Sequence, residues 1–476
     1  MNIRENLTSM SKESVNIPSF TSTSNNQEAK LKSVPIWYDG KTINEIIFCE
    51  EFLKRYCLIY TEGAFFSTEG KISDESKIKT WILDEIKEYV TSSITKKIHN
   101  ITELLKLSAC VESFSPQTDR IHFQNGTLFL NDNVFSKDKH EIVRARFPID
   151  YNPNASEPFV WLNTLNSLFY PEDIPAIQEF IGYCLIPTNK GQRMLFIKGK
   201  GGEGKSQIGI VIRHIFGSNA KDGSVAKLSE DRFARADLEH ENLMIDDDMK
   251  VEALKQTDYI KKIVTSNGKM DLEKKGKQSY QGYMYVRIIA FSNGDLQALY
   301  DKSNGFYRRQ LVVVTKEKSP DRKDNPFIAE QMCAESEGIL CWAIEGLKRL
   351  IANNYVFSES ERMITNRETV RSNSCNAIEF LSSEGFIEFD EESTISSKEL
   401  YEVYCYWCNE NAYAAMKVRS FSDFMSEQLN FLPITKTNNI RNDIGGRVWG
   451  YKGIKRVAYK PTGNSLCTYV QNDVPF

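Results

Sequence analysis

The sequence predicts an α/β protein whose central domain is a mostly parallel sheet flanked by helices. Between Arg193 and Val314, short apolar runs of strand length alternate with segments of helical periodicity, which is the pattern of an α/β sheet domain. The sharpest alternation is an apolar run, a glycine-rich turn and an apolar helix at residues 194–216. We expect the functional site at this turn.

Length and composition exclude several classes of protein. The 476 residues suggest about three domains, and 41% hydrophobic with 26% charged residues is typical of soluble globular proteins. Ten scattered cysteines do not form a disulfide framework, which favours a reducing, cytoplasmic location. No apolar run approaches the roughly 20 residues of a membrane helix, so we expect no membrane partner.

Changes in composition divide the chain into five parts. Residues 1–35 are rich in Ser, Thr and Asn and predict a flexible tail. Residues 36–170 predict a mainly helical domain, with a hairpin whose turn is Asn125-Gly126. The remaining parts are the sheet domain at 171–357, a polar linker at 358–374 and a small domain at 375–476.

The turn after the apolar run 194–197 reads Gly199-Lys200-Gly201-Gly202-Glu203-Gly204-Lys205-Ser206. It satisfies the pattern G-x-x-x-x-G-K-[ST], in which glycines let backbone N–H groups surround phosphates. Lys205 would contact the β and γ oxygens of ATP, and Ser206 would ligate Mg²⁺. The alternative is a glycine-rich turn with a chance lysine, but the strand before it and the helix after it favour a nucleotide site.

Two later segments supply the polar groups that such a loop needs. Asp246-Asp247-Asp248 end an apolar strand; Asp246 would hold Mg²⁺, and Asp247 would orient or deprotonate the attacking water. The sequence leaves open which aspartate takes which role. Asn293 follows the apolar run 285–291 and is the candidate contact to the γ-phosphate. Taken alone, each segment is equally an ordinary polar turn.

Arg308 and Arg309 stand directly before the apolar run 311–314. A solvated pair is the simple interpretation. In a ring of ATPases, an arginine at this place would reach the neighbouring subunit's γ-phosphate and stabilise transition-state charge. Arg308 is the first candidate and Arg309 the alternative.

In this order, the loop, the acids, Asn293 and Arg308 resemble a superfamily 3 helicase of the AAA+ class. More narrowly, residues 46–460 resemble the phage/plasmid primase-helicase family, related to the poxvirus helicase-primase, and are similar to staphylococcal mobile-element replication initiators. The resemblance implies a hexameric helicase with Lys205, Asp246, Asp247, Asn293 and Arg308 as catalytic residues. The chain departs from the family in two places. The loop has Glu203 where the family often has Asn, and the second motif is an Asp triplet, whereas the family's second motif often ends in Glu.

The resemblance also places a DNA-holding hairpin between the acids and Asn293. Lys274, Lys275 and Lys277 surround Gly276 there, and lysines at a hairpin tip would neutralise phosphates of single-stranded DNA without reading sequence. An exposed charged turn is the alternative.

Residues 375–476 predict helices followed by a hairpin, a winged-helix-like order. From Ala412 to Lys460 there are nine Lys or Arg and three Asp or Glu, a local charge of 9 − 3 = +6, which favours duplex origin DNA as a partner. A charged face without a ligand is the alternative. Cys405 and Cys408 are interpreted as core thiols rather than metal ligands.

These features together predict an ATP hydrolase that initiates replication of a phage, plasmid or genomic island as a ring helicase on single-stranded DNA. Two other functions stay open. One is an ATPase that binds and melts an origin and recruits a host helicase; the other is a nucleotide switch without unwinding. A host primase or polymerase is a further candidate partner.

Overall fold

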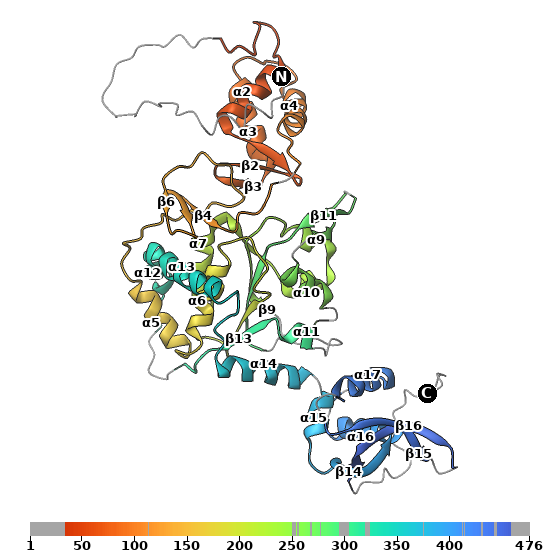
Figure 1. The fold of residues 1–476 in the computed structure, drawn as a ribbon. Coiled ribbons are helices and arrows are strands. Elements are labelled where there is room, and N and C mark those ends of the chain that lie inside the picture. Colours follow the sequence, from red (N-terminus) through yellow and green to blue (C-terminus); the bar gives the residue numbers. More distant parts are fainter. Residues whose placement is uncertain are drawn as a thin grey trace.

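The computed structural model describes residues 34–457, except 113, 250–253, 255–256, 267–268, 277, 295–303, 319–323, 375, 412, 414, 430–431 and 442–444. The described chain forms an N-terminal unit, a central sheet domain and a C-terminal domain, placed one after another along the molecule (Figure 1). The predicted tail lies outside the described residues except for its last two positions.

The N-terminal unit packs three helices with a small antiparallel sheet. Its elements are α2 (Glu45–Tyr56), β1 (Ile59–Thr61), β2 (Ala64–Ser67), β3 (Gly70–Ile72), α3 (Glu75–Ile86) and α4 (Ile94–Ser108). Its hydrophobic core runs from Trp37 to Ala109. The predicted domain continued to residue 170, but from Ile121 onward the buried side chains join the core of the sheet domain instead.

A second small sheet connects the N-terminal unit to the sheet domain. It consists of β4 (Arg120–Phe123), β5 (Gly126–Phe129) and β6 (Phe135–Ser136). Phe123 pairs with Gly126, so Gln124 and Asn125 form the two-residue loop. The predicted hairpin is confirmed, with its turn one residue earlier than expected.

The central domain is built on five parallel strands, which confirms the predicted α/β class. In spatial order these are β13 (Gln310–Val314), β7 (Met194–Lys198), β12 (Arg287–Ser292), β9 (Leu243–Met249) and β8 (Ala220–Asp222). Alternate residues enter two different cores: Leu195 and Ile197 lie on one face, whereas Met194 and Phe196 lie on the other. Strands buried on both faces are expected to be continuously apolar, as residues 194–197 of β7 and 311–314 of β13 are.

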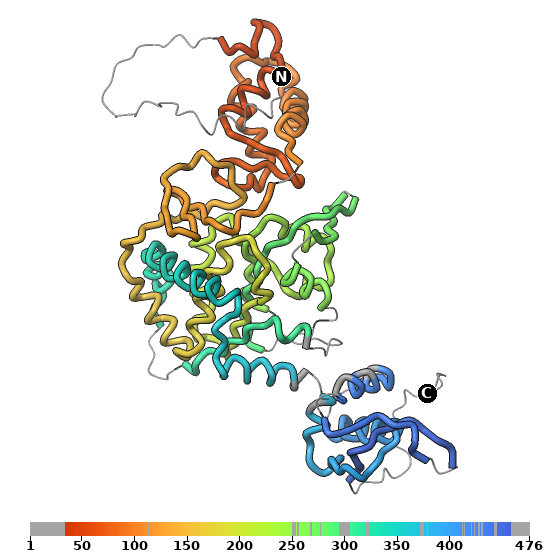
Figure 2. Tube along the Cα trace, viewed as in Figure 1, coloured from red at the N-terminus to blue at the C-terminus, as the bar shows by residue number. Residues whose placement is uncertain are grey.

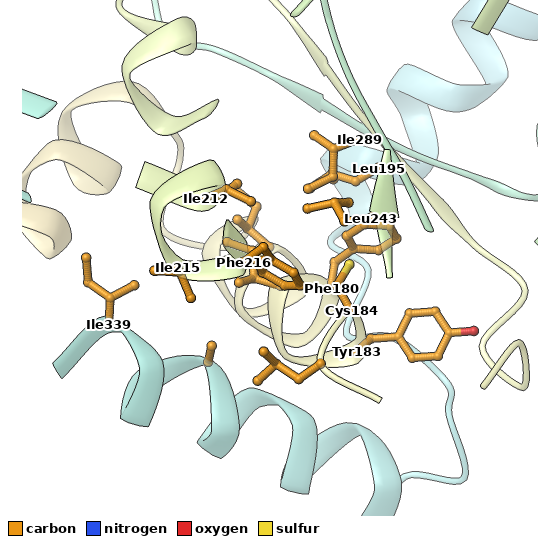
Figure 3. Close-up of a cluster of buried hydrophobic side chains, with 14 of the residues drawn as sticks. Phe180, Tyr183, Cys184, Leu195, Ile212, Ile215, Phe216, Leu243, Ile289 and Ile339 are labelled. Atoms are coloured by element: carbon orange, nitrogen blue, oxygen red, sulfur yellow. The ribbon is translucent and has the colours of Figure 1, made fainter. Parts of the chain in front are cut away.

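Helices cover both faces of this sheet. One face carries α5 (Phe159–Leu168), α6 (Ile174–Tyr183), α7 (Lys205–Phe216), α12 (Ile328–Cys333) and α13 (Ser336–Ala352). Figure 3 shows Ile212 and Phe216 of α7 packed near Leu195 of the sheet. The other face carries α8 (Val225–Glu230), α9 (Arg232–Ala236), α10 (Asp258–Thr265), α11 (Asn304–Tyr307) and the hairpin of β10 (Lys269–Leu272) and β11 (Tyr280–Tyr283). A short 3-10 turn, η1 (Gly217–Asn219), follows α7.

The segment predicted to be a linker contains helix α14 (Glu361–Ser374), which packs against β13. Its Asn366 side chain donates a hydrogen bond of 3.4 Å to the carbonyl of Val312. Met363 and Val370 are buried. Two apolar residues seven positions apart in a polar segment give a weak sequence signal, yet they lie on one face of a helix.

The C-terminal domain has a core of its own. Its elements are α15 (Asn376–Ser382), β14 (Ile387–Ser396), α16 (Ser397–Glu410), α17 (Val418–Gln428), β15 (Thr435–Arg441) and β16 (Arg447–Arg456), with the strands antiparallel in the order β14-β16-β15. Ser396 caps α16 by accepting a hydrogen bond from the Glu399 amide at 3.1 Å. Cys408 is buried and Cys405 half-buried within α16. Among all the described helices, none is long and apolar enough to cross a membrane.

Candidate phosphate-binding site

The glycine-rich loop connects the end of β7 directly to the start of α7. Gly201, Gly202 and Gly204 have φ angles of +104°, +78° and +105°, a backbone region that other residues enter at a cost. At Gly199, an added Cβ would lie 2.6 Å from both the Lys205 Nζ and the Thr315 Oγ1. Backbone conformation therefore favours glycine at positions 201, 202 and 204, whereas close neighbours favour it at Gly199.

A cavity of about 610 Å³ opens beside this loop. The loop and the ends of β9 and β12 form one wall, and α5 with residues 324–328 forms the other. The candidate residues that line the cavity are Gly201, Gly202, Gly204, Lys205, Ser206, Asp247, Asp248 and Asn293. Parallel strands bring their carboxyl ends to one edge of a sheet, which is where ligands bind in α/β folds.

Asn293 lies next to the loop lysine. The Lys205 Nζ donates a hydrogen bond of 3.1 Å to the Asn293 Oδ1, because β12 is the immediate neighbour of β7 and runs parallel to it. The structure thus joins two predicted site residues that are far apart in the sequence.

Asp246 faces away from the cavity. Its side chain belongs to the other face of β9, where its Oδ2 accepts a hydrogen bond of 2.8 Å from the Val225 amide at the start of α8. Burial raises the pKa of Asp246, and the carboxylates of Asp248 and Asp247 add to this rise against the lowering effect of the Val225 amide. The structure does not bring this predicted Mg²⁺ ligand to the loop, because Asp246 continues the face of Met244. A β-bulge between Asp246 and Met249 interrupts this alternation, and both Asp247 and Asp248 line the cavity.

Asp247 lines the cavity with Asp248 and Ser206. Its Oδ2 lies 3.3 Å from the Arg213 Nη2 of α7. Its Oδ1 is buried and has no hydrogen-bond partner among the described residues. A buried carboxylate oxygen without a partner is costly unless something else binds it, and oxygen ligands are those Mg²⁺ prefers. The donor set of Asp247, Asp248 and Ser206 therefore fits Mg²⁺.

Lys200 and Glu203 of the loop point in opposite directions. Lys200 forms an ion pair with Glu317 on the outer surface, where both side chains are about 80% exposed. Glu203 is buried inside the loop and contacts Lys205. Sequence reasoning missed Thr315, Arg213 and Glu317, since their roles depend on contacts with distant segments and no local pattern marks them.

Arg308 is exposed. It lies near the amino ends of the strands, whereas the loop lies at their carboxyl ends. Gln310 pairs with Met194 at the beginning of β7, whereas the loop follows the end of that strand. Five strand residues rise by about 16 Å, so Arg308 is not brought to the loop of its own subunit. Arg309 is half-buried and donates a hydrogen bond to the carbonyl of Gly305.

The lysine hairpin formed by β10 and β11 projects from the sheet domain (Figure 2). Lys275 is exposed beside Gly276, whose φ of +76° makes the turn. Lys274 instead forms a 2.8 Å ion pair with the buried carboxylate of Glu239. Lys277 lies outside the described residues.

Near the base of this hairpin, ion pairs connect the sheet domain to the N-terminal unit. The sequence did not predict these contacts. Glu241 pairs with Lys71 of β3 at 2.8 Å, and Arg144 pairs with Glu62 at 2.9 Å. Between them, burial together with the charges of Lys71 and Arg144 lowers the pKa of His240 to about 3. His240 is therefore neutral and serves the packing of the two units.

In the C-terminal domain, acidic residues of β14 and α16 form ion pairs with some of the basic residues between positions 412 and 460. Lys455 lies 3.2 Å from both Glu388 and Asp390, and Arg456 pairs with Glu399 at 3.1 Å. Other basic side chains are exposed on α17, the residue before it, and the hairpin: Lys417, Arg419, Lys436, Arg441 and Arg447.

These features define an α/β protein with a five-stranded parallel sheet and a glycine-rich loop at its carboxyl edge. Residues 197–309 match the model of a family described as "Family of unknown function (DUF5906)". No curated protein matches this chain significantly.

Solved structures are similar over most of the chain. The apo structure of the NrS-1 C terminal region (305-718) has a TM-score of 0.51 at 10% identity, covering 86% of this chain and 99% of that chain. Two A form apo structures of the same region have TM-scores of 0.48 at 10% and 11% identity, covering 85% and 86% of this chain and 98% and 99% of theirs. At 10% identity, the likeness to the first of these structures shows a shared fold and no more.

Proposed function

We propose that this chain is an ATP-hydrolysing DNA helicase that acts as a ring in the initiation of replication of a mobile element. One observation carries the proposal: Lys205, Asn293 and Asp247 come from three adjacent parallel strands or their loops and meet at one cavity. A phosphate loop, an acid and a polar γ-phosphate contact on neighbouring strands form the arrangement that ATP hydrolysis requires.

Each residue at the cavity has a chemical part in this proposal. The loop N–H groups and Lys205 would bind the β and γ phosphates, and Asn293 would contact the γ oxygen. Ser206 and Asp247 would hold Mg²⁺, which supplies positive charge against the phosphates. We reassign the metal role from Asp246 to Asp247, and Asp248 would orient the attacking water.

Asp247→Asn is expected to bind ATP yet lose hydrolysis by at least about 10²-fold, the scale of a lost metal contact worth several kcal/mol. Asp246→Asn is the matched control. The asparagine amide oxygen can still accept the hydrogen bond from the Val225 amide, and the side chain lies outside the cavity. Steady-state phosphate release measures both. An inactive Asp246→Asn beside an active Asp247→Asn would return the metal role to Asp246.

Two surfaces support the DNA part of the proposal. Lys275 is exposed on a projecting hairpin, the position at which a ring helicase holds its strand. The C-terminal domain has the order helix, strand, two helices and hairpin, and Lys417 and Arg419 are exposed at the start of α17. In a winged-helix arrangement α17 would enter the major groove of duplex DNA.

Lys275→Ala is expected to weaken single-strand binding and to reduce the log–log salt slope by about 0.7 for the lost phosphate contact. Fluorescence anisotropy with labelled oligonucleotide at several salt concentrations measures both quantities. The control is Lys54→Ala, an exposed lysine on α2 of the N-terminal unit. Equal affinity and slope in the wild type and Lys275→Ala would make Lys275 an ordinary solvated residue.

Strand displacement on forked DNA with ATP tests the function as a whole. ATP-dependent unwinding supports the helicase. ATP-dependent melting of duplex origin DNA without displacement of a fork would replace it with the origin-melting initiator. Hydrolysis that DNA neither stimulates nor requires, with no unwinding, would favour the nucleotide switch.

A further inference from the structure

The loop contains a buried carboxylate that is bound by the loop's own amides and lysine. Glu203 is only 3% exposed. Its Oε2 accepts hydrogen bonds of 2.9 Å from both the Gly201 amide and the Lys205 ammonium, and its Oε1 accepts one from the Lys200 amide. All three donors belong to the glycine-rich loop itself.

These donors are of the kind that bind phosphate in such loops: backbone N–H groups and the lysine ammonium. A carboxylate that gathers them presents the same chemistry to the loop as a phosphate oxygen does. Burial raises the pKa of Glu203, but the Lys205 hydrogen bond and the backbone amides outweigh it and hold the pKa below its usual value. Glu203 therefore stays charged within the loop.

An incoming nucleotide meets two obstacles in this arrangement. The Lys205 ammonium already has an anionic partner, and the phosphates would approach a buried carboxylate of the same charge. In a water-excluded site, such like-charge contacts are more costly than at the surface. Phosphate can take the Lys200 and Gly201 amides only after the Glu203 carboxylate has left them, and it must share the three donors of the Lys205 ammonium with Glu203 and Asn293.

We propose that Glu203 is an internal phosphate mimic that competes with nucleotide for the loop and thereby limits its affinity. This inference rests on the proposed function, in which the loop binds ATP. It makes Glu203 a determinant of affinity, since a phosphate that takes the Lys200 and Gly201 amides must displace the mimic. The opposite role is that Glu203 positions Lys205 for the nucleotide. The two roles predict opposite changes in Kd when Glu203 is replaced: a lower Kd for a mimic and a higher Kd for a positioning residue.

The experiment is calorimetric titration of the full chain with Mg²⁺·ADP and, separately, with inorganic pyrophosphate. Glu203→Gln keeps the size and an acceptor oxygen but removes the charge, so we expect the Kd for both probes to fall about tenfold. Glu203→Ala, which removes the competitor completely, should bind at least as tightly. Glu317→Gln is the matched control: it removes one negative charge from the exposed partner of Lys200 and should change Kd less than about twofold.

The outcomes separate this inference from the nucleotide assignment. If the wild type binds ADP and both Glu203 variants bind more weakly, Glu203 is a positioning residue and the mimic is refuted, while the nucleotide site stands. Equal binding by both variants would show that Glu203 does not set the affinity and would refute the mimic as well. If neither the wild type nor any variant binds either probe, the nucleotide site and the inference fall together. A similar gain in Glu317→Gln would show a general charge effect and would also refute the mimic.

Discussion

Lys205→Ala is expected to reduce ATP hydrolysis by on the order of 10³-fold, the upper range for loss of one preorganised donor to transition-state charge. Lys205 supplies the ammonium of the loop and contacts both Glu203 and Asn293. No other lysine or arginine lines the cavity as described, so no second cation replaces it. Phosphate release by the purified variant, with ATP in excess, measures the loss.

The control for this variant follows from the same contacts. Lys205→Ala leaves the buried Glu203 carboxylate without its cation, which is costly in a site that excludes water. The double variant Lys205→Ala/Glu203→Gln removes both charges and should unfold at a temperature close to that of the wild type. Hydrolysis at the wild-type rate in either variant would contradict the assignment of the loop.

Features of the fold and of the site that depend on local pattern could be predicted from the sequence. The loop, the flanking strand and helix, and the hairpin near Asn125 each follow from a few consecutive residues. The face on which each aspartate of β9 lies could not be predicted, because three consecutive acids carry no alternation. That choice depends on the packing of α8, whose Val225 amide binds Asp246.

Long-range contacts explain the other differences. Helix α14 is polar apart from a few buried positions such as Met363 and Val370, so only its contact with β13 shows that it is not a loose linker. Lys274 looks equivalent to Lys275 in the sequence, yet Glu239 of a distant segment binds it. A one-dimensional pattern shows which residues are charged but not which of them have partners.

Arg308→Ala is expected to bind ATP normally and to lose hydrolysis by about 10³-fold or more, the scale of an arginine finger. The position of Arg308 makes this a statement about two subunits. It is exposed at the start of β13, while the loop lies beyond the far end of the neighbouring β7. A direct contact between Arg308 and a bound γ-phosphate would therefore be with the loop of an adjacent subunit.

Arg308→Lys serves as the matched variant. Lysine keeps the charge but lacks the planar, two-pronged donor geometry of a guanidinium, so partial activity is expected if only charge matters and near-complete loss if geometry does. Arg309 is a poor control, since it is half-buried and bound to the Gly305 carbonyl. Its loss would disturb α11 and β13 whatever its part in catalysis.

Mixing two inactive proteins decides whether Arg308 acts across the interface. An Arg308→Ala subunit has an intact loop, and a Lys205→Ala subunit has an intact arginine. In mixed rings, some interfaces would pair the intact loop of the first with the intact arginine of the second, so part of the ATPase activity should return. Activity that stays absent in rings shown to be mixed would argue against simple pairing of one loop with one arginine. Full activity of Arg308→Ala by itself would remove Arg308 from the mechanism, because a residue that stabilises transition-state charge cannot be lost without lowering the rate.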